Sequence, residues 1–292
     1  MSDQQTAGST DSSAADWSIS PDAYKAFCSF LQERCGIVLG TGKEYLIRSR
    51  LVPLLSRYDA VSLDQLLDKV IRGDNLSLER TVIDAMTTNE TFWFRDVYPY
   101  EILGSRILPE LVRERRRIRI WSAACSSGQE PYSIAMVIQE QAERLPDLKS
   151  AAVDIVASDI SDSMLEMAQK GVYDSLSMSR GLDSERRRRF FQIHDETAGS
   201  CQISESIRSM VSFKRLNLLG NLAVLGSFDI IFCRNVLIYF SREEKLRIII
   251  NFARMLRPGG YLFLGSSEFM SGIEEYFEMI RLNPGIIFKR LG

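Results

Sequence analysis

The sequence predicts an α/β fold, in which a doubly wound, mostly parallel sheet follows a small helical domain and is interrupted by an insert. Three observations lead to this prediction. Apolar residues recur every three or four positions through residues 21–89, as in amphipathic helices. From Ile118 onward, short apolar strands alternate with helical segments. This alternation pauses between residues 176 and 213.

Composition sets the general class of the protein. The chain has 292 residues, of which 45% are hydrophobic, enough for one large domain with a smaller companion. Its 36 basic and 38 acidic residues give a net charge of -2, which does not favour a nucleic-acid binder. The five cysteines form no Cys-x-x-Cys pair, so we expect reduced thiols, a cytoplasmic protein and no metal site. No apolar run reaches transmembrane length.

The N-terminal part divides into a tail and a helical domain. Residues 1–20 are rich in Ser, Thr, Asp and Gln and lack the apolar segment of a secretory signal, which predicts a disordered tail. Residues 21–89 have helical spacing, and helix ends are expected at Ser62, just before one periodic run, and at Gly73-Asp74-Asn75, just after another. The apolar residues at this spacing include Tyr24, Phe27, Phe30, Leu31, Leu46, Leu51, Leu54, Leu55, Leu63, Leu66, Leu67, Val70 and Ile71.

Strands and helices alternate in the rest of the chain. A parallel sheet built this way binds its ligand at the carboxyl ends of the strands. The expected strands are Ile118–Trp121, Ala152–Ser158, Phe228–Cys233 and Tyr261–Gly265, the last of them after a Pro258-Gly259-Gly260 turn. The expected helices are Tyr132–Glu140, Ser163–Lys170 and Glu243–Leu256.

The insert at residues 176–213 carries a helix-like run through Arg186–Arg189 and then a polar segment, Gln192–Cys201, with the only histidine, His194. A small antiparallel subdomain and a mobile loop both fit this pattern. The arginine run is typical of a charged helix face, and a histidine in a polar loop is not expected to be catalytic.

The stretch Ser122–Ser133 lies between the first strand and its helix. Its small residues allow a ligand close to the backbone, and Pro131 suits the first turn of a helix. Gly128 is its only glycine, which argues against a dinucleotide pyrophosphate site. The carboxylate of Glu130 suits a cationic group such as the ammonium of an amino-acid-like ligand. An ordinary tight turn with Glu130 at a helix N-terminus is the alternative.

Asp159 ends the second strand. An acid at this position can accept hydrogen bonds from both hydroxyls of a ribose, or it can cap the next helix together with Ser161. Taken with the preceding loop, ribose binding is the better interpretation, because one site then holds a nucleoside and the other its charged tail.

Five motifs in order resemble the CheR-type chemoreceptor glutamate O-methyltransferases, which depend on S-adenosylmethionine. Each motif is modest alone, but the ordered set is specific and covers the chain from about residue 21 to its end. The motifs are Met86–Asp96 (MTTNETFWFRD), Trp121–Ser133 (WSAACSSGQEPYS), Ala157–Ile160 (ASDI), Asn217–Leu219 (NLL) and Phe232–Phe240 (FCRNVLIYF).

The resemblance implies a helical domain at residues 21–89 and a Rossmann-like methyltransferase domain at residues 90–292, with an antiparallel β-subdomain inserted at about 176–213. It implies that Asn217 and Leu218 flank the adenine and that Arg234 and Asn235 lie near the methyl-transfer position. The residues that it assigns to S-adenosylmethionine, whose product is S-adenosylhomocysteine, are Asn89, Thr91, Arg95, Glu130, Asp159, Asn217, Leu218, Arg234 and Asn235. Without the motifs, Asn217 would be read as a turn former and Arg234 as a surface charge.

The resemblance also places Arg95 and Tyr239 beside the transferable methyl group as catalytic residues. The planar guanidinium of Arg95 can orient a carboxylate, and the Tyr239 hydroxyl can steady the substrate or the methyl donor. The alternatives are an inter-domain salt bridge for Arg95 and core packing for Tyr239. A glutamate carboxylate is ionised at neutral pH, so its methylation needs positioning and no general base.

Four basic residues predict a docking surface. Lys43, Arg48, Arg50 and Arg57 would lie on one amphipathic helix, and the resemblance makes this helix the docking site for the acidic, cytoplasmic helical domain of chemoreceptors. A solvated basic face is the alternative. In some family members the β-subdomain also holds a peptide from the receptor C-terminus, but Gln192–Arg208 lacks the glycine-flanked basic pattern, which argues against tethering.

Two other functions compete with chemoreceptor methylation. A protein that binds S-adenosylmethionine as a sensor, without turnover, is disfavoured because Arg95, Tyr239 and the cofactor loop are all retained. Methylation of a nucleic acid or a small molecule is disfavoured because the sequence has neither an Asn/Asp-Pro-Pro-Tyr/Phe motif nor a broad basic stripe. We therefore expect a cytoplasmic enzyme, recruited to receptor arrays and not inserted into the membrane.

Overall fold

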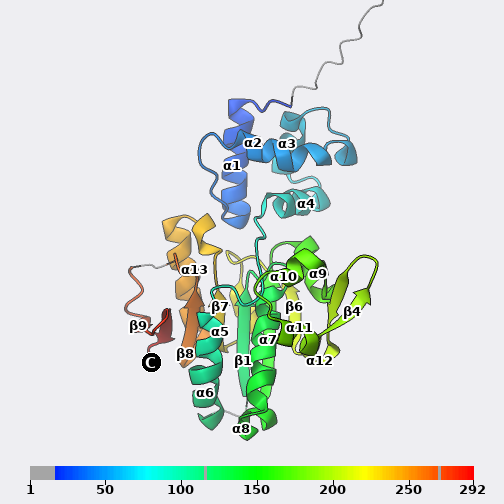
Figure 1. Ribbon diagram of the computed structural model, residues 1–292. Helices are drawn as coiled ribbons and strands as arrows, with labels where there is room; N and C mark the ends of the chain where they lie inside the picture. The colour runs from blue at the N-terminus through cyan, green and yellow to red at the C-terminus, as the bar shows by residue number, and fades with distance from the viewer. Residues whose placement is uncertain (1–16, 115–116, 269–270) are drawn as a thin grey trace, which may run out of the picture.

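A computed structural model describes residues 17–114, 117–268 and 271–292. An all-helical domain lies above one end of an α/β domain (Figure 1). Residues 1–16 of the predicted tail lie outside the described residues. Residues 17–20 are packed rather than free, because Trp17 and Ile19 contact the core of the helical domain and Ser20 caps its first helix.

The helical domain has four helices whose ends follow from local sequence. They are α1 (Pro21–Cys35), α2 (Glu44–Leu51), α3 (Leu63–Arg72) and α4 (Leu76–Met86). The Ser62 hydroxyl accepts from the Gln65 N–H at the start of α3, and Gly73 ends this helix at a φ of 74°. Both predicted helix ends are confirmed. The apolar faces form a buried core of Phe27, Leu31, Ile47, Leu51, Leu63, Leu66, Leu67 and Val82.

The prediction of one basic helix across Lys43–Arg57 is wrong. Helix α2 ends at Leu51 and is followed by two 3₁₀ turns, η1 (Val52–Leu54) and η2 (Ser56–Tyr58). Pro53 lacks the N–H that an α-helix needs at this position, and its ring favours the end of the helix.

The main sheet has seven strands in the order β6-β2-β1-β7-β8-β10-β9. Strands β6, β2, β1, β7 and β8 are mutually parallel, whereas β10 is antiparallel to both of its neighbours. The order reverses between β1 and β7, which creates the crevice where doubly wound sheets bind ligands. Strand bounds are β1 Arg117–Ala123, β2 Ala152–Asp159, β6 Val211–Arg215, β7 Phe228–Cys233, β8 Leu256–Leu264, β9 Phe277–Arg281 and β10 Ile286–Arg290.

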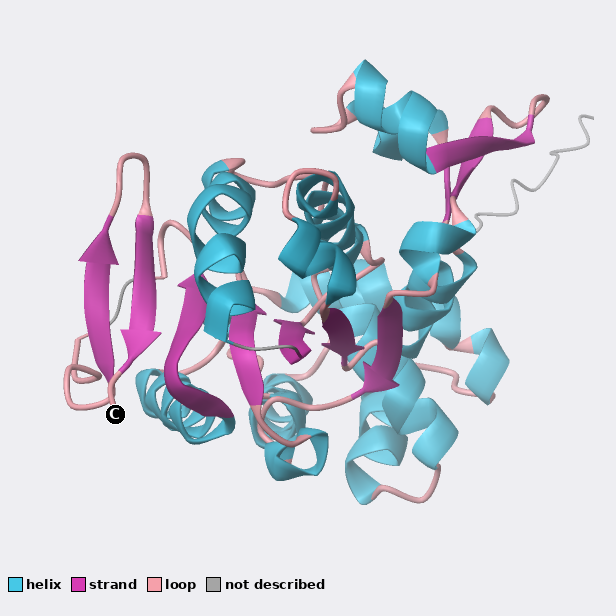
Figure 2. Ribbon diagram, turned by 90° about the horizontal axis from the view of Figure 1, so that it is seen from below, coloured by secondary structure: helices cyan, strands magenta, loops and turns pink. Residues whose placement is uncertain are grey.

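Helices cover both faces of the sheet (Figure 2), which confirms the predicted fold class. None of the helices in the described part of the chain has the length and apolar character of a membrane span. Their bounds are α5 Tyr98–Ile102, α6 Leu108–Glu114, α7 Gln129–Ala142, α8 Pro146–Ser150, α9 Asp162–Lys170, α10 Ser175–Ser179, α11 Ser184–Phe190, α12 Glu205–Arg208 and α13 Arg242–Met255.

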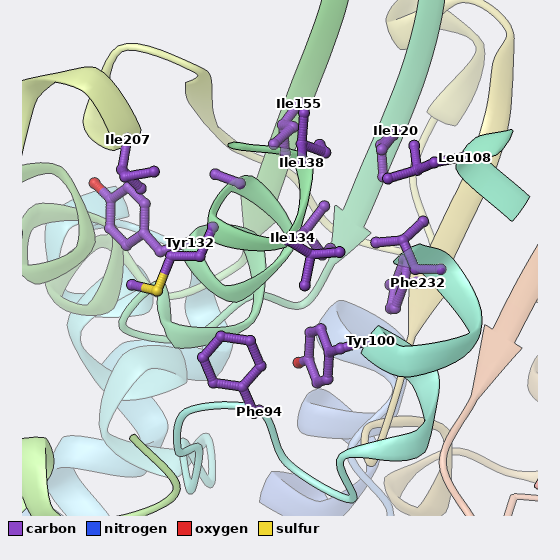
Figure 3. Close-up of a cluster of buried hydrophobic side chains, with 14 of the residues drawn as sticks. Phe94, Tyr100, Leu108, Ile120, Tyr132, Ile134, Ile138, Ile155, Ile207 and Phe232 are labelled. Carbon is purple, nitrogen blue, oxygen red and sulfur yellow. The ribbon is translucent and has the colours of Figure 1, made fainter. Parts of the chain in front are cut away.

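A hydrophobic core fills each face of the sheet. On one face, Ile134 and Ile138 of α7 pack against Ile120 of β1 and Ile155 of β2 (Figure 3). The strands here are buried on both faces, as a parallel sheet requires. The opposite core includes Trp121, Phe228, Ile231, Ile248, Ile249 and Phe252.

Strand β8 differs from the prediction at Pro258-Gly259-Gly260. Instead of a turn before the strand, these residues form an irregularity inside it, because Phe228 pairs with Leu256 while Ile230 pairs with Tyr261. The extra residues of β8 are accommodated by Gly259 at a φ of 76°.

The insert is a small antiparallel sheet rather than a structureless loop. Its order is β3-β5-β4, with β3 at Val172–Tyr173, β5 at Ser200–Ile203 and β4 at Phe191–Asp195. The sheet thus begins before residue 176. Residues 211–213 belong to β6, since that strand pairs with β2 in the main sheet.

The arginine run of α11 holds the insert against the main domain. Arg186 donates to both carboxylate oxygens of Glu140 on α7, at 2.7 and 3.0 Å, and its guanidinium carbon lies 4.0 Å from the centroid of the Phe94 ring. Arg189 pairs with Glu143, the residue that follows the end of α7. Two of the four arginines are therefore attachment points of the insert.

Candidate active site

One cavity lies at the carboxyl ends of β1, β2 and β7, where the helical domain meets the sheet. Its wall contains all ten residues that the sequence assigned to cofactor and catalysis: Asn89, Thr91, Arg95, Glu130, Asp159, Asn217, Leu218, Arg234, Asn235 and Tyr239. Residues of the helical domain complete the wall, among them Ile37, Val38, Leu46 and Arg50.

Close contacts join the helical domain to the α/β domain at the cavity. The Val38 N–H donates to the Tyr239 carbonyl at 3.0 Å, and the Asn217 amide donates to the Arg34 carbonyl at 2.6 Å. A Cβ atom on Gly36 would lie 2.3 Å from ring atoms of Phe240. The end of α1 therefore reaches the catalytic domain only because residue 36 is glycine, which also adopts a φ of 77°.

The loop after β1 ties three parts of the site together. The Ser126 N–H donates to Asp159 Oδ2 at 2.7 Å, and the Ser126 hydroxyl donates to the Asn89 carbonyl at 2.8 Å. Gly128 caps α7 at a φ of 95°, and a Cβ there would lie 2.9 Å from that of Ala168. The small residues of this loop thus bring the ends of β1 and β2 and the inter-domain segment into direct contact.

Asp159 is 6% exposed and lines the cavity. Burial raises its pKa above the ordinary value, against the lowering effect of backbone hydrogen bonds from Ser161 and Ser126. The capping role predicted as the alternative falls to Ser161, whose hydroxyl accepts from the Met164 N–H at the start of α9. Each Asp159 oxygen accepts one N–H and keeps further acceptor capacity for a ligand.

Glu130 and Arg234 form a buried charge network. Glu130 accepts from the Ser122 hydroxyl at 2.7 Å and from Arg234 Nη1 at 3.4 Å. Arg234 Nη2 donates to Asp96 at 2.6 Å and to the Arg95 carbonyl at 2.8 Å, and the Arg234 side chain is only 1% exposed. Burial raises the pKa of Glu130, although Arg234 opposes this. Arg234 is therefore not a surface charge.

Arg95 and Tyr239 are half-buried in the cavity wall. Arg95 donates to the Glu90 carbonyl at 3.0 Å, and its guanidinium carbon lies 5.3 Å from the centroid of the Phe92 ring. Tyr239 ends the 3₁₀ turn η5 (Leu237–Tyr239). Arg95 thus bonds to a carbonyl near it in sequence, and Tyr239 keeps part of its surface in the cavity instead of being enclosed in a core.

Asn217 is engaged on both sides of its amide. Its oxygen accepts from the Leu219 N–H at 3.0 Å, while its nitrogen donates to the Arg34 carbonyl. The amide nitrogen keeps one N–H donor and the amide oxygen keeps one lone pair for a ligand. Asn217 therefore fixes a turn, as the motif-free interpretation expected, and also joins the two domains.

The structure corrects the assignment of Arg50 to the docking surface. Its guanidinium is turned inward, where it donates to the carbonyls of Met86 and Thr87 at 2.6 and 2.9 Å and to the Thr88 hydroxyl at 3.1 Å. Arg50 thus holds the segment between the domains and lines the cavity. The other three predicted docking residues, Lys43, Arg48 and Arg57, are exposed.

Unpartnered polar atoms gather at the cavity. Within the described residues, four buried side-chain polar atoms have no hydrogen-bond partner, and three of them belong to residues of the cavity wall: Tyr100 Oη, Arg234 Nε and Asn235 Oδ1. Buried polar groups are almost always paired, so such a cluster indicates a polar ligand. Two buried acids nearby, Glu130 and Asp159, suit a ligand with an ammonium group and a ribose, as S-adenosylmethionine has.

Backbone strain is concentrated around the same place. Seven non-glycine residues in the described part of the chain have positive φ, and six of them lie at the carboxyl end of the sheet: Phe94, Asp96, Val97, Ala124, Ser126 and Asn235. Such conformations are costly and typical of functional sites.

Sequence reasoning gave no role to Asp96 or to Glu268. Asp96 pairs with buried Arg234, and Glu268 accepts from the backbone N–H of Asn235. Asp96 lies inside the first motif, which could have pointed to it as a site residue. Glu268 lies outside all five motifs. Within the described residues, no group of three or more His, Cys, Asp or Glu side chains is arranged to hold a metal ion.

Comparison with known families matches nearly the whole chain. Residues 22–87 match the CheR methyltransferase all-alpha domain, and residues 89–286 match the CheR methyltransferase SAM binding domain. Similar proteins include a chemotaxis protein methyltransferase of Vibrio parahaemolyticus, 52% identical, with 93% of this chain and 98% of that protein covered. Chemotaxis protein methyltransferase 1 of Pseudomonas aeruginosa is 49% identical, with 91% and 97% covered.

The two domains match in the expected order, and the relatives are about 50% identical over most of both chains. The chain belongs to the CheR family of S-adenosylmethionine-dependent chemotaxis methyltransferases.

Proposed function

We propose that this protein transfers the methyl group of S-adenosylmethionine to glutamate side chains of chemoreceptors and forms glutamate methyl esters. The observation that carries the proposal is a cavity between the two domains, whose wall contains all ten residues that the resemblance assigns to the cofactor and to catalysis. The names of its relatives, chemotaxis protein methyltransferases, support a receptor as the acceptor.

The residues of the cavity suit the parts of the cofactor. Asp159, with acceptor capacity left on both oxygens, holds the ribose hydroxyls. Glu130 holds the ammonium, and Asn235 Oδ1 is an unpaired acceptor of a residue in the same cavity wall. Leu218, which is 6% exposed, supplies an apolar surface for the adenine. Asn89, Thr91, Asn217 and Arg234 complete the binding site.

The chemistry requires little more than alignment. When bound, S-adenosylmethionine supplies an electrophilic methyl group on a positively charged sulfur. The acceptor glutamate is already ionised at neutral pH, so no side chain has to remove a proton. Arg95 orients the acceptor carboxylate, and the Tyr239 hydroxyl steadies the reactants. Holding reacting atoms in line contributes up to about 7–11 kcal/mol in favourable cases.

The receptor docks through the exposed basic residues Lys43, Arg48 and Arg57. These side chains are complementary to an acidic helical bundle, and their attraction is expected to weaken with salt. The enzyme acts in the cytoplasm at receptor arrays. Holding a receptor C-terminal peptide on the small sheet is not part of the proposal, since the expected sequence pattern is missing from Gln192–Arg208.

The test is transfer from methyl-labelled S-adenosylmethionine to cytoplasmic fragments of candidate receptors, followed by alkaline treatment. We expect label on the receptor and its release as methanol, since glutamate methyl esters are hydrolysed by base. Base-stable label would overturn the ester assignment. Binding of S-adenosylhomocysteine without any transfer would instead favour the cofactor-sensor alternative.

A further inference from the structure

Glu268 is a buried carboxylate outside every recognised motif. It follows β8, is 6% exposed and does not line the cavity. Its backbone N–H donates to the Gly265 carbonyl at 2.9 Å, while its own side chain folds back to accept the Gly265 N–H at 2.7 Å. This closed turn fixes the carboxylate at the end of the strand.

The same carboxylate accepts two more N–H groups from the chain that follows β7. Oε2 accepts from Asn235 at 2.7 Å, and Oε1 accepts from Ile238 at 3.3 Å. The sheet register brings these groups together. Cys233 at the end of β7 pairs with Leu264 at the end of β8, so the segments that follow the two strands begin side by side. Three backbone donors from two strand ends thus converge on one side chain.

These donors belong to the part of the site that methyl transfer needs. Asn235 has a positive φ of 59°, lines the cavity and carries an unpaired side-chain oxygen. Ile238 is the middle residue of η5, the turn that ends at Tyr239. The N-terminal end of η5 has no side-chain cap of its own, so the Glu268 carboxylate satisfies a donor there.

Gly265 is required by this arrangement. A Cβ at this position would lie 2.6 Å from Glu268 Oε2 and 2.9 Å from the Asn235 nitrogen. Any side chain at residue 265 would therefore separate the carboxylate from Asn235. Gly265 and Glu268 act as one unit, which makes the arrangement testable from two positions.

We propose that Glu268 is a positioning residue for methyl transfer, which holds Asn235 and the turn that ends at Tyr239 in place in the wall of the cavity. The inference rests on the proposed function of this site. Glu268 touches neither substrate nor cofactor; it acts through the backbone of the β7 end. A small displacement of aligned reacting groups costs up to about 100-fold in rate.

The experiment measures turnover per cofactor site in the full-length protein. Glu268→Gln keeps one acceptor oxygen, Glu268→Ala removes both, Gly265→Ala displaces the carboxylate, and Glu275→Gln is the control on an exposed glutamate. Sites are counted by calorimetric titration with S-adenosylhomocysteine, and transfer to a receptor fragment is measured together with thermal unfolding. We expect turnover per site to fall about 10-fold for Gln and about 100-fold for Ala, with the receptor Michaelis constant within about 2-fold of wild type.

Gly265→Ala should lower turnover per site as Glu268→Gln does, and the double variant should show little further loss, because both changes break the same contacts. If Glu268→Ala does not fold, the other two variants supply the measurement. Wild-type turnover per site in Glu268→Gln and Gly265→Ala, with only a lower unfolding temperature, would mean that Glu268 is merely structural. Failure of the wild-type protein to transfer methyl groups would overturn the proposed function itself.

Discussion

Arg50 and Arg48 lie on the same helix, two residues apart, yet the structure gives them different tasks. Arg48 is exposed, whereas the Arg50 guanidinium holds the segment that joins the domains through the carbonyls of Met86 and Thr87. Replacing each arginine by alanine therefore separates docking from cofactor binding.

The expected loss follows from the contacts. Hydrogen bonds from charged donors contribute about 1.5–3 kcal/mol each. Because water reaches the half-buried Arg50 side chain, the two short bonds together stabilise the fold by about 2–3 kcal/mol, less than their full sum. This corresponds to a fall in unfolding temperature of about 4–12 °C.

Cofactor affinity should fall as well. Asn89 and Thr91 line the cavity immediately after the held segment. If Thr87 and Thr88 lose their anchor, binding must order them again, at about 1–2 kcal/mol of backbone entropy for each. We expect the Kd for S-adenosylhomocysteine to rise about 30- to 700-fold in Arg50→Ala.

The assay compares three quantities in both variants: unfolding temperature, calorimetric Kd and receptor Michaelis constant at low and high salt. Arg48→Ala should change only the Michaelis constant, and that effect should shrink with salt. The reasoning is refuted if Arg50→Ala leaves stability and Kd at wild-type values and raises only the receptor Michaelis constant, since Arg50 would then be the docking residue that the sequence alone suggested.

Four further outcomes are expected. Asp159→Asn should weaken cofactor binding by about 1–3 kcal/mol; an unchanged calorimetric affinity would remove its ribose role. Tyr239→Phe should lower turnover more than cofactor affinity, and equal turnover would exclude a contribution of the hydroxyl. Because burial raises the pKa of both Glu130 and Asp159 and a cationic ligand favours their ionised forms, cofactor affinity should be greatest above these pKa values and fall as pH drops through them. Titrations at several pH values check this, and a flat profile would contradict it. Reversing the charge of Arg57 should raise the receptor Michaelis constant in a salt-dependent way, with cofactor Kd unchanged as the control.

The sequence alone was sufficient for the fold class, and the motif resemblance named ten of the residues that line the cavity. Helix ends at Ser62 and Gly73 depend on local hydrogen bonds and backbone angles, which are properties of residue type. The strands are apolar runs, and their carboxyl ends meet in any doubly wound sheet. Asp159 and the Ser122–Ser133 loop could therefore be expected side by side, and the Ser126–Asp159 hydrogen bond joins them.

Other features depended on contacts between residues far apart in the chain. Helical spacing placed Arg50 with the exposed arginines, but the path of the inter-domain segment turned it inward. The Pro258-Gly259-Gly260 stretch looked like a turn, yet pairing with β7 absorbed it into a strand.

What the sequence determined by itself was the order of elements, the fold class and the residue types available to a nucleoside-binding site, because these follow from local propensity and periodicity. Only the tertiary structure decided which of those side chains reach the cavity and which hold its walls. Asn217 joins the domains, Arg50 anchors the segment between them, and Glu268 collects three backbone donors. Each of these roles arises from partners brought together by strand register and domain packing, which no local pattern encodes.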